Sequence, residues 1–532
     1  MQLSVVALLG ALALPSAAVP HARDEGQCKQ TTVAILGGGM AGIAAAQTLH
    51  NASMEDFMIL EYRDTIGGRA WHEPFGQDKD GNPYIIEMGC NWVQGLGTPG
   101  GPQNPVWTLA HVYNLSTVYS NYSNVSTYNQ HGYKDYSHLI DAWDDVYDTA
   151  AAQAGVMLLD NLQDQTAKTG LALAGWRPKV DDMEAQAVDW WSWDFEDAYT
   201  PLESSFIFGV AGQNLTENGF SDEDNFVIDQ RGYSHIIHGM ASTFLEPNDT
   251  RLLLNNHITN ISYSDSGVTI HSADGSCVRA SYAICTFSLG VLQNHAVTFT
   301  PSLPEWKQEA IEGFTMGTYT KIFLQFNETF WPEDTQYFLY ADPYMRGYYP
   351  VFQSLSTEGF FPGSNIIFVT VTEQFAWRAE RQSDEQTKEE VLDVLRKMFP
   401  DKTIPEPIAF MYPRWTLEPW SYGSYSNWPP STTLEMHENL RANAGRLWFA
   451  GEATSPTYFG FLHGAWFEGQ AAGMEISRIL NGTCSSSSSS SKTNGTCSGR
   501  KHYETLHGTT PLADYSFVDG WDGNSFYDYN DD

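Results

Sequence analysis

The sequence has few cysteines and no long apolar run. Six cysteines in 532 residues are too few for a disulfide framework. Four of them show no spacing typical of zinc ligands, so we expect no metal site: Cys28, Cys90, Cys277 and Cys285. The other two, Cys484 and Cys497, bracket a serine run and can close a loop there. No apolar segment reaches the roughly 20 residues of an ordinary membrane span.

Positive charge is also scarce. The chain has 28 Lys and Arg against 64 Asp and Glu, a formal charge of −36. This balance argues against nucleic acid as a partner and suits a cationic partner or substrate. An alternative is that the acidity only keeps a secreted protein soluble.

The N-terminus is typical of a signal peptide. Val5 to Leu14 is a short apolar core, and Ser16-Ala17-Ala18 offers small residues for cleavage. Residues 1–18 are therefore predicted to be removed, and the protein is expected to be secreted, with the cell wall as one destination. Ten N-glycosylation sequons agree with secretion: Asn51, Asn114, Asn121, Asn124, Asn214, Asn248, Asn260, Asn327, Asn481 and Asn494.

The order of predicted elements is mixed, with no internal repeat. A strand, a glycine-rich turn and a helix span residues 31–50, and irregular sequence follows to about residue 129. Helical patterns occupy residues 141–160 and 384–398, and short strands cluster over 251–300 and 337–371. A last strand and helix end near Leu480, and residues 483–532 are serine-rich and then acidic, which predicts a disordered tail.

TTVAILGGGMAGIAAAQTL is the clearest motif. An apolar strand runs into Gly37, Gly39 and Gly42, and an alanine-rich helix follows. The glycines allow a tight turn and close approach to a pyrophosphate, and the helix N-terminus attracts its charge. A second strand, Phe57 to Leu60, ends in Glu61, where an acid can bind a ribose hydroxyl. The sequence therefore predicts a dinucleotide site.

Two further segments identify a family. Gly67-Gly68-Arg69 resembles the GGR that follows the ribose-binding acid in FAD-dependent amine oxidases, and FAGEATSPTYFGFLHGAWFEGQAAG resembles their C-terminal flavin segment. With MGCNWVQG, SLGVLQ, YTKIFLQF and YSNWP, the resemblance covers residues 31–480 and is greatest to secreted plant and fungal polyamine oxidases.

The resemblance implies an α/β (α+β two-domain) fold. It combines a Rossmann-like FAD-binding domain with a substrate domain of a mixed sheet flanked by helices. We expect the FAD-binding domain to be discontinuous over residues 31–110, 213–310 and 424–482, and the substrate-binding domain to comprise residues 111–212 and 311–423.

The resemblance also implies cofactor and catalytic roles. Gly68 and Arg69 are expected near the pyrophosphate, and Glu452 near the ribityl–phosphate region. The helix starting near Gly464 would point its N-terminus at the flavin. Lys321 stands in a strand among aromatic residues, where the family lysine holds a water against the flavin, and Tyr319 is beside it. The alternative for Lys321 is a surface or ion-paired lysine.

The substrate side depends on VDWWSWDFEDAY. Glu196 falls where plant enzymes carry a tunnel glutamate, with Asp194 and Asp197 nearby. Three aromatic residues in the segment can hold an alkyl-ammonium chain: Trp191, Trp193 and Phe195. The alternative is an ordinary helix with packed tryptophans and an acidic edge.

The sequence departs from the plant pattern at Gln94, where those enzymes have a second tunnel glutamate. Glutamine can hydrogen-bond an amine but cannot neutralise one, so an N-acetylated or shorter amine becomes more plausible. Phe461, before the flavin ring, and Tyr425 are candidate walls, and both can equally be core residues.

The resemblance implies FAD-dependent oxidation of a polyamine such as spermidine, spermine or an N-acetyl derivative. An aminoaldehyde, a shorter amine and hydrogen peroxide would form, with oxygen as the second substrate. Phe449 to Gly473 lacks the cysteine used for covalent attachment, so we expect FAD to be bound non-covalently. We also expect the protein to be a monomer. The alternatives are an L-amino-acid oxidase or other amine oxidase of the superfamily, and a flavoprotein without turnover.

Overall fold

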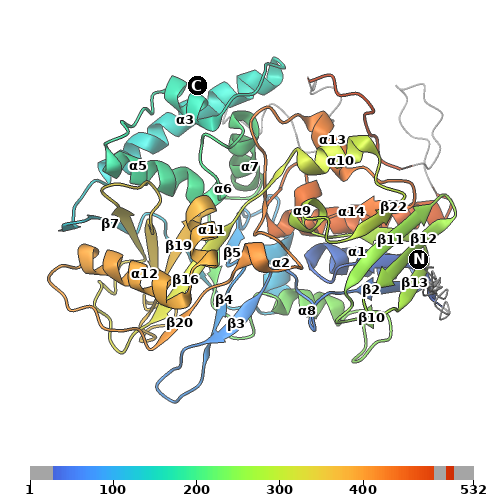
Figure 1. Cartoon of the computed structure of the whole chain (residues 1–532), viewed down its shortest axis with the longest axis horizontal. Coiled ribbons are helices and arrows are strands. Elements are labelled where there is room, and N and C mark those ends of the chain that lie inside the picture. The colour runs from blue at the N-terminus through green and yellow to red at the C-terminus, as the bar shows by residue number, and fades with distance from the viewer. Residues whose placement is uncertain (1–27, 484–498, 509–532) are drawn as a thin grey trace, which may run out of the picture.

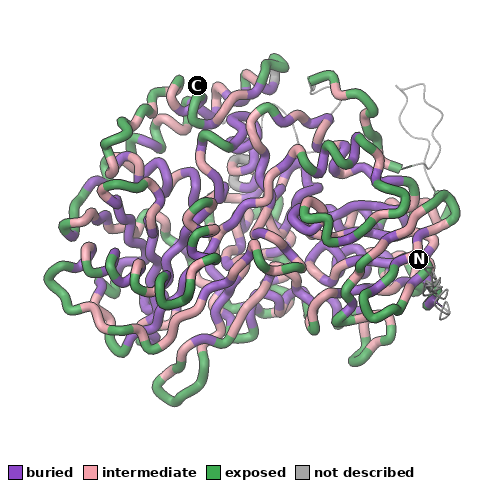
Figure 2. The backbone as a smooth tube through the Cα atoms, in the orientation of Figure 1, coloured by how far each residue is buried: buried purple, intermediate pink, exposed green. Residues whose placement is uncertain are grey.

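The computed structural model describes residues 28–483 and 499–508, and Figure 1 shows two large sheets side by side with helices around them. Buried backbone fills the interior of both parts, and exposed backbone lies at the periphery (Figure 2). In these ranges no helix is both long enough and apolar enough to cross a bilayer. The predicted signal peptide and the cysteines at 484 and 497 lie outside the described residues.

The first sheet has eight strands and joins distant parts of the chain. Its parallel part consists of β10 (Leu252–Leu253), β2 (Phe57–Leu60), β1 (Lys29–Leu36), β13 (Cys277–Cys285) and β22 (Leu447–Phe449). β12 (Gly267–Ser272) and β11 (Ile258–Ser264) continue it antiparallel, and β14 (Thr298–Thr300) pairs parallel to β11. The strands predicted over residues 31–60 and 251–300 therefore form one Rossmann-like sheet.

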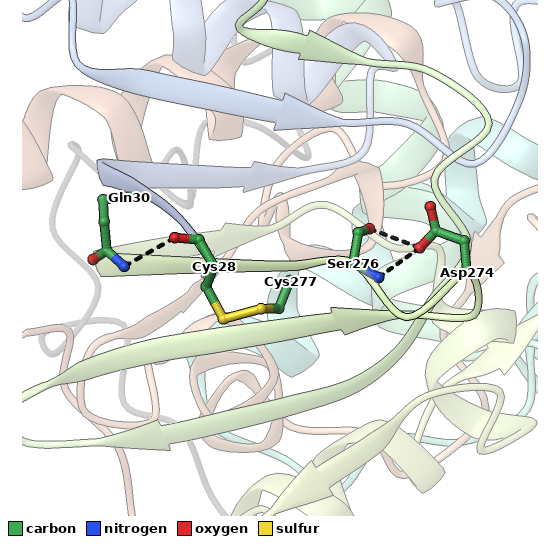
Figure 3. Close-up of a disulfide and its surroundings, with 5 residues drawn as sticks. All are labelled: Cys28, Gln30, Asp274, Ser276 and Cys277. Carbon is green, nitrogen blue, oxygen red and sulfur yellow. Dashed lines mark hydrogen bonds between the residues drawn. A yellow bond between two sulfur atoms is a disulfide. The ribbon is translucent and has the colours of Figure 1, made fainter. Parts of the chain in front are cut away.

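A disulfide joins Cys28 to Cys277 across 249 residues of chain (Figure 3). Cys28 directly precedes β1, and Cys277 begins β13, its parallel neighbour. The sequence analysis did not assign this pair, because the two cysteines become neighbours only when β1 and β13 pair. The bond fixes the start of the strand that leads into the glycine-rich turn.

Two long helices cross beside this sheet. α1 (Met40–Asn51) follows β1, and α14 (Leu462–Leu480) closes the predicted C-terminal unit. A Cβ atom placed on Gly469 of α14 would lie 2.1 Å from the backbone oxygen of Ala41. Only glycine permits this approach, so the first and last helices of the unit pack backbone to backbone.

The second sheet is mixed and has seven strands. Its order is β20 (Ala409–Met411), β16 (Tyr319–Gln325), β19 (Ile366–Thr372), β18 (Val351–Ser354), β17 (Tyr337–Ala341), β7 (Val125–Asn129) and β8 (Gly132–Tyr133). Only β17 and β7 pair parallel. Ile322 and Leu324 join the cluster that includes α12 (Asp384–Met398), whereas Phe323 joins a cluster with Phe75 and Ile86. The predicted alternation of side chains along β16 is confirmed, with both faces buried.

Helices surround the second sheet. Those on the side of the tryptophan-rich segment are α3 (His138–Leu159), α4 (Ala167–Ala174), α5 (Met183–Asp189), α6 (Phe195–Asp197) and α7 (Phe206–Gly219). A π-helical turn, Trp190–Asp194, joins α5 to α6. α11 (Glu373–Arg381) also packs on this sheet, whereas α8 (His235–Ala241), α9 (Leu289–Gln293), α10 (Glu305–Glu312) and α13 (Leu434–Arg441) lie beside the first sheet (Figure 1). The predicted fold class is confirmed.

The segment predicted to be irregular, from residue 51 to 129, contains more structure than expected. It holds α2 (Pro105–Val112) and five short strands: β3 (His72–Phe75), β4 (Tyr84–Glu87), β5 (Trp92–Gln94), β6 (Thr117–Tyr119) and the start of the second sheet at β7. β5 and β6 both pair with β9 (Asp224–Val227), and β15 (Thr315–Met316) pairs with β21 (Ser426–Asn427). β3 and β4 pair with each other, whereas β5, β6 and β7 pair with strands distant in sequence, which local pattern could not reveal.

Residues 499–508, part of the segment predicted to be a disordered tail, belong to the described structure. Residues 499–508 lie against the first sheet's helices. Arg500 is 6% exposed and pairs with Glu468 and Glu475 of α14 at 3.2 and 3.0 Å. His502 stacks on Trp306 of α10 with ring centroids 4.4 Å apart. Buried ion pairing and aromatic contact order these residues, and composition alone could not show either. The division into domains remains a prediction.

Candidate active site

A single elongated cavity of about 560 Å³ collects most of the predicted site residues. Its walls come from the glycine-rich turn, the end of β2, the loop after it, β5, α6, β16 and the start of α14. The cavity therefore extends from the first sheet to the second, and segments more than 400 residues apart in sequence meet in it.

The glycine-rich turn forms one end. Gly37 has φ +118°, and a Cβ on it would lie 2.3 Å from Oγ1 of Thr286. Gly39 is the N-cap of α1, and no side chain caps the helix there. Met40 and Ala41, the first helical residues, line the cavity with Gly39. An uncapped helix N-terminus behind a glycine cradle is suited to a pyrophosphate.

Gly42 has a different role in the same motif. A Cβ on it would lie 2.0 Å from the backbone oxygen of Gly37, so only glycine fits. Beside the turn, Gly67 donates its N–H to the oxygen of Gly38 at 3.0 Å. Gly68, with φ +57°, lines the cavity together with Gly67 and Arg69. The two glycine-rich segments thus form one backbone surface.

Glu61 directly follows β2, at the backbone surface formed by the two glycine-rich segments. It is 5% exposed and lines the cavity. Its carboxylate accepts hydrogen bonds from the N–H groups of Gly38 at 2.6 Å and Arg63 at 2.8 Å. Burial raises the pKa of Glu61, and the two backbone donors oppose that shift. A carboxylate fixed in this way has lone pairs left for the hydroxyls of a ribose.

Arg69 and Glu452 meet in the middle of the cavity. Nη1 of Arg69 donates to Oε1 of Glu452 at 2.7 Å and to the backbone oxygen of Ser424 at 2.8 Å. The other oxygen of Glu452 accepts from the Ser426 hydroxyl at 2.6 Å and from the N–H of Gly460 at 2.9 Å. The ion pair of Arg69 with Glu452 joins the N-terminal and C-terminal motifs. Because the two charges cancel, this pair adds no net charge to the middle of the cavity.

The start of α14 provides a second uncapped helix N-terminus. Phe461 is its N-cap residue, no side chain caps it, and its first turn contains no acid. Phe461, Leu462 and Ala465 all line the cavity. The helix begins two residues before the predicted start at Gly464, and it directs its positive dipole end at the cavity, as expected.

Lys321 lies directly behind the cavity wall. It is 1% exposed, so the surface alternative is excluded. Its Nζ donates to the backbone oxygen of Gly89 at 2.7 Å and to Oδ1 of Asn91, and both of these residues line the cavity. Burial lowers the pKa of Lys321 to about 7, against the opposing charges of Glu87 and Cys90. A lysine that titrates near neutrality can hold or release a proton.

Aromatic side chains form the far end of the cavity. Tyr319 lines this end, two positions before Lys321 on β16. Its ring centroid lies 5.9 Å from that of Phe195 and 6.1 Å from that of Tyr425. Burial raises the pKa of Tyr319 well above its usual value, so its hydroxyl stays protonated. This cluster gives an apolar path beside a titratable lysine.

One carboxylate is placed among these rings. Oε1 of Glu196 accepts a hydrogen bond from Nε2 of Gln94 at 2.8 Å. The hydroxyl of Tyr425 donates to the backbone oxygen of Glu196 at 2.7 Å. All three residues line the cavity.

Asp197 also lines the cavity but differs from its neighbour. It is 8% exposed and accepts from Nε2 of Gln213 at 2.8 Å. Burial raises the pKa of Asp197 well above its usual value, and the Gln213 bond only partly opposes this. Burial therefore disfavours the charged form of Asp197 more than that of an exposed aspartate.

Other residues of the tryptophan-rich segment do not line the cavity. Asp194 accepts two bonds from Arg346 at 2.6 Å each and is 2% exposed. Trp191 and Trp193 are core residues, so only Phe195 of the three suggested aromatics reaches the cavity. The π-helical turn causes this division, because its extra residue per turn rotates successive side chains away from ordinary helical spacing.

Sequence analysis missed several wall residues: Asn91, Trp92, Tyr122, Trp415 and Trp420. Asn91 and Trp92 stand inside the quoted MGCNWVQG motif, which was a signal for them. Tyr122 and Trp420 lie in loops and Trp415 begins a short 3-10 helix, Trp415–Leu417, and their proximity to the cavity depends on tertiary structure. Among the described residues, no group of three or more His, Cys, Asp and Glu side chains is arranged to bind a metal.

The fold and the cavity define a class of protein. A Rossmann-like sheet with a glycine cradle, a ribose-binding acid and a second helix N-terminus is the architecture of a dinucleotide-dependent oxidoreductase. Residues 40–477 match the family model for flavin containing amine oxidoreductases. The chain belongs to that family, and it is an oxidoreductase enzyme with a flavin cofactor.

The curated relatives are similar over nearly their whole length. The chain is 36% identical to polyamine oxidase 1 of Zea mays over 497 residues, which covers 88% of this chain and 93% of that protein. It is 35% identical to polyamine oxidase 7 of Oryza sativa subsp. japonica, covering 88% and 97%. A solved structure of putrescine oxidase bound to putrescine aligns with a TM-score of 0.65 at 20% identity, over 85% of this chain and 99% of that one. This last likeness supports the fold.

Proposed function

We propose that the protein oxidises a polyamine at a secondary amine. The amine is oxidised to an imine, and water then releases an aminoaldehyde and a shorter amine, while oxygen is reduced to hydrogen peroxide. The observation that carries the proposal is the carboxylate of Glu196 among aromatic rings, in the same cavity as the glycine cradle. The names of the plant relatives support the same substrate class.

The residues present fit FAD. Gly37, Gly39 and Gly68 leave backbone where a side chain would fill the cavity, and α1 offers its uncapped N-terminus to the pyrophosphate. Glu61 would hold the ribose, and Arg69 with Glu452 would flank the middle of the cofactor. Bound FAD supplies the two-electron acceptor that the amine oxidation requires.

Non-covalent binding is part of the proposal. Phe449 to Gly473 contains no cysteine, and the cysteine that lines the described cavity is Cys90. Burial raises the pKa of the Cys90 thiol to about 12, so it is a poor nucleophile at neutral pH. Denaturing the protein in acid should release the flavin into the supernatant, and flavin retained on the precipitated chain would contradict this.

The chain's own groups bind and orient the amine. Glu196 would pair with one ammonium of the substrate, and the rings of Phe195, Tyr319 and Tyr425 would contact its alkyl chain. Gln94 is neutral and burial disfavours the charged form of Asp197, so Glu196 is the carboxylate proposed to pair with the ammonium. A substrate with one retained ammonium near Glu196, such as N1-acetylspermine or spermidine, fits this arrangement.

Lys321 would accept the proton that leaves the reacting nitrogen of the substrate. Two acceptors, Gly89 and Asn91, hold Nζ behind the wall. Since a neutral amine has two N–H groups and one lone pair, the neutral form of Nζ can take up a proton that leaves the substrate. Reaction requires an unprotonated substrate nitrogen, and a group with a pKa near 7 is suited to that transfer.

An L-amino-acid oxidase needs a cation to hold the substrate carboxylate. Among the described residues that line the cavity, Arg69 is the only lysine or arginine, and it already pairs with Glu452. The cavity therefore favours amines over amino acids.

The test is peroxide release from purified protein with spermidine, spermine and N1-acetylspermine, with products identified by mass spectrometry. Turnover is expected, and 1,3-diaminopropane or its acetyl derivative would show which side of the secondary nitrogen is cleaved. Turnover of L-amino acids without turnover of any of the three amines would contradict the proposal.

Secretion is also proposed. Six sequon asparagines are exposed: Asn51, Asn114, Asn121, Asn248, Asn327 and Asn481. The Cys28–Cys277 disulfide suits an oxidising compartment. Protein from the medium of expressing cells should begin near residue 19 and gain mobility after enzymatic deglycosylation. Retention inside the cells with an intact N-terminus would contradict secretion.

We also propose that the protein is a monomer. Light scattering on the same sample should give the molar mass of one chain.

A further inference from the structure

Asn104 is completely buried between the two ends of the site. It is the N-cap residue of α2, and its Oδ1 accepts from the N–H of Val106 at 2.8 Å. Its Nδ2 lies 2.7 Å from the backbone oxygen of Gln94 and 3.2 Å from Nδ1 of His463. One side chain thus contacts β5, α2 and α14.

These contacts leave one orientation for the amide. A backbone N–H only donates and a backbone oxygen only accepts, so Oδ1 must face Val106 and Nδ2 must face Gln94. The second hydrogen of Nδ2 then points to Nδ1 of His463, which must accept it. The ring proton of neutral His463 is therefore on Nε2, from which it donates to Oγ1 of Thr216 at 3.2 Å. Burial lowers the pKa of His463 to about 3, so the ring stays neutral.

Both partners of Asn104 lead directly to the cavity. Gln94 donates its side-chain amide to Glu196, the proposed anchor for the substrate ammonium. His463 stacks under Phe461, with ring centroids 5.0 Å apart and planes at 24°. Phe461 lines the cavity at the uncapped start of α14. The chain of contacts therefore connects the amine end of the cavity with the flavin end.

We propose that Asn104 is a positioning residue that fixes, through Gln94 and His463, the separation between the Glu196 carboxylate and the flavin end of the cavity. This inference rests on the proposed function. The separation determines which carbon beside the secondary nitrogen meets the cofactor when the ammonium is anchored. A displacement of about 1 Å at a reacting centre can cost on the order of 100-fold in rate. A residue that fixes this separation therefore affects specificity.

The first test reads the tautomer of His463 in the FAD-loaded protein without substrate, by NMR of protein labelled with 15N-histidine. The account predicts a protonated Nε2 and an unprotonated Nδ1 from pH 5 to 8. A proton on Nδ1, or a ring that titrates in this range, would overturn it. His463→Gln assigns the signal. Because no amine is present, this result does not depend on whether the protein oxidises polyamines.

The second test uses Asn104→Ser. Serine retains the capping acceptor for α2 but is too short to reach Gln94 and His463. We expect the KM for the amine to rise about tenfold, kcat to fall about tenfold or more and the product ratio to shift, while flavin content changes less than about threefold. A folded variant with wild-type KM and products would overturn the proposal.

The matched control is Thr166→Ser, at the N-cap of α4, where the side chain accepts from the N–H of Thr169 and the residue does not line the cavity. It should leave the KM and the products unchanged. If Asn104→Ser fails to fold, the tautomer of the wild-type protein still decides the question. If wild-type protein oxidises no amine, the proposed function fails separately from the His463 result.

Discussion

At the scale of single residues, the most consequential feature is a lysine buried without a carboxylate in hydrogen-bond contact. The described contacts of Nζ in Lys321 are the oxygens of Gly89 and Asn91, and its distances to the ring centroids of Trp92 and Phe323 are both 5.9 Å. Low polarity around an amine penalises the charged form. The fold therefore maintains a proton acceptor that is active near neutral pH.

The first prediction concerns Lys321→Met. Because the pKa of Lys321 is lowered to about 7, the amine is neutral above pH 7 and charged below it. The rate of anaerobic flavin reduction should rise with pH through this value in wild-type protein. The variant should keep its FAD, lose this step in the pH profile and react about 100-fold or more slowly. Stopped-flow absorbance measures both effects.

The control for this variant is Lys307→Met. Lys307 is the other fully buried lysine among the described residues, and its Nζ donates to backbone oxygens of Asn439, Leu440 and Ala442. Losing these bonds should lower the melting temperature without changing the pH profile of flavin reduction. Equal loss of rate in both variants would show that Lys321 acts only through stability.

A second prediction concerns the amine anchor. Glu196→Gln removes the charge that would pair with the substrate ammonium, and a hydrogen bond to a charged group contributes about 1.5–3 kcal/mol. We expect the KM for spermidine to rise about 10- to 100-fold with little change in flavin binding. Asp197→Asn is the matched control. Because burial disfavours the charged form of Asp197, the KM of this variant should change less than about threefold. Equal KM values for both variants would exclude Glu196 as the anchor.

At the scale of elements, the site depends on where α1 and α14 cross. Gly469 of α14 lies on the backbone of Ala41, and Ala41 lines the cavity at the start of α1. The N-termini of both helices reach the same cavity. The packing of two helices separated by over 400 residues in sequence therefore determines where the two positive dipole ends lie.

The third prediction tests this crossing with Gly469→Ala. Its Cβ would lie 2.1 Å from the oxygen of Ala41, so the helices must separate. We expect FAD affinity to fall at least tenfold, measured by flavin fluorescence after dilution. Gly219→Ala is the control. Its Cβ would meet only the hydroxyl of Tyr458, at 3.4 Å, so wild-type affinity is expected. Wild-type affinity in both variants would contradict the role of the crossing.

The elements recovered from sequence were those with strong local patterns. β2 and α12 have the bounds that alternation and helical periodicity predicted, and the glycine-rich turn was found from its spacing. The helix α2 and the π-helical turn at Trp190 were not recovered. α2 depends on a cap at Asn104 whose other partners are distant in sequence, and the turn has no periodic pattern of its own.

Only part of the site could be predicted from the sequence, for the same reason. The resemblance placed Lys321, Glu196 and Gln94 near one another, and the structure brings them around one cavity. It could not show that Asp194 pairs with Arg346, because that contact joins residues 152 positions apart. The raised pKa of Asp197 was also not predictable, since it depends on burial.

At the scale of the whole molecule, distant segments hold the first sheet's unit together. The disulfide joins Cys28 to Cys277, and Arg500 brings the segment 499–508 to α14. Glu468 receives both Arg441 at 2.9 Å and Arg500 at 3.2 Å and is 4% exposed in its side chain. The pKa of Glu468 stays below its usual value because the two arginines outweigh the cost of burial.

The fourth prediction concerns Arg500→Ala. Removing one partner of a buried ion cluster costs about 3–5 kcal/mol, because the remaining charges stay buried. The free energy of unfolding should fall by that amount in urea, with the flavin still bound in the folded fraction. Lys501→Ala, next to it, is an exposed control and should have little effect. Equal stability of both variants would mean that the segment does not support α14.

The measurement that tests the central claim most directly is anaerobic mixing of the FAD-loaded protein with N1-acetylspermine or spermidine, followed by flavin absorbance. The account predicts that the flavin is bleached with one amine oxidised per flavin, and that admitting oxygen restores the absorbance and yields one hydrogen peroxide. Flavin that stays oxidised with every polyamine, in protein that retains its FAD, would contradict the account.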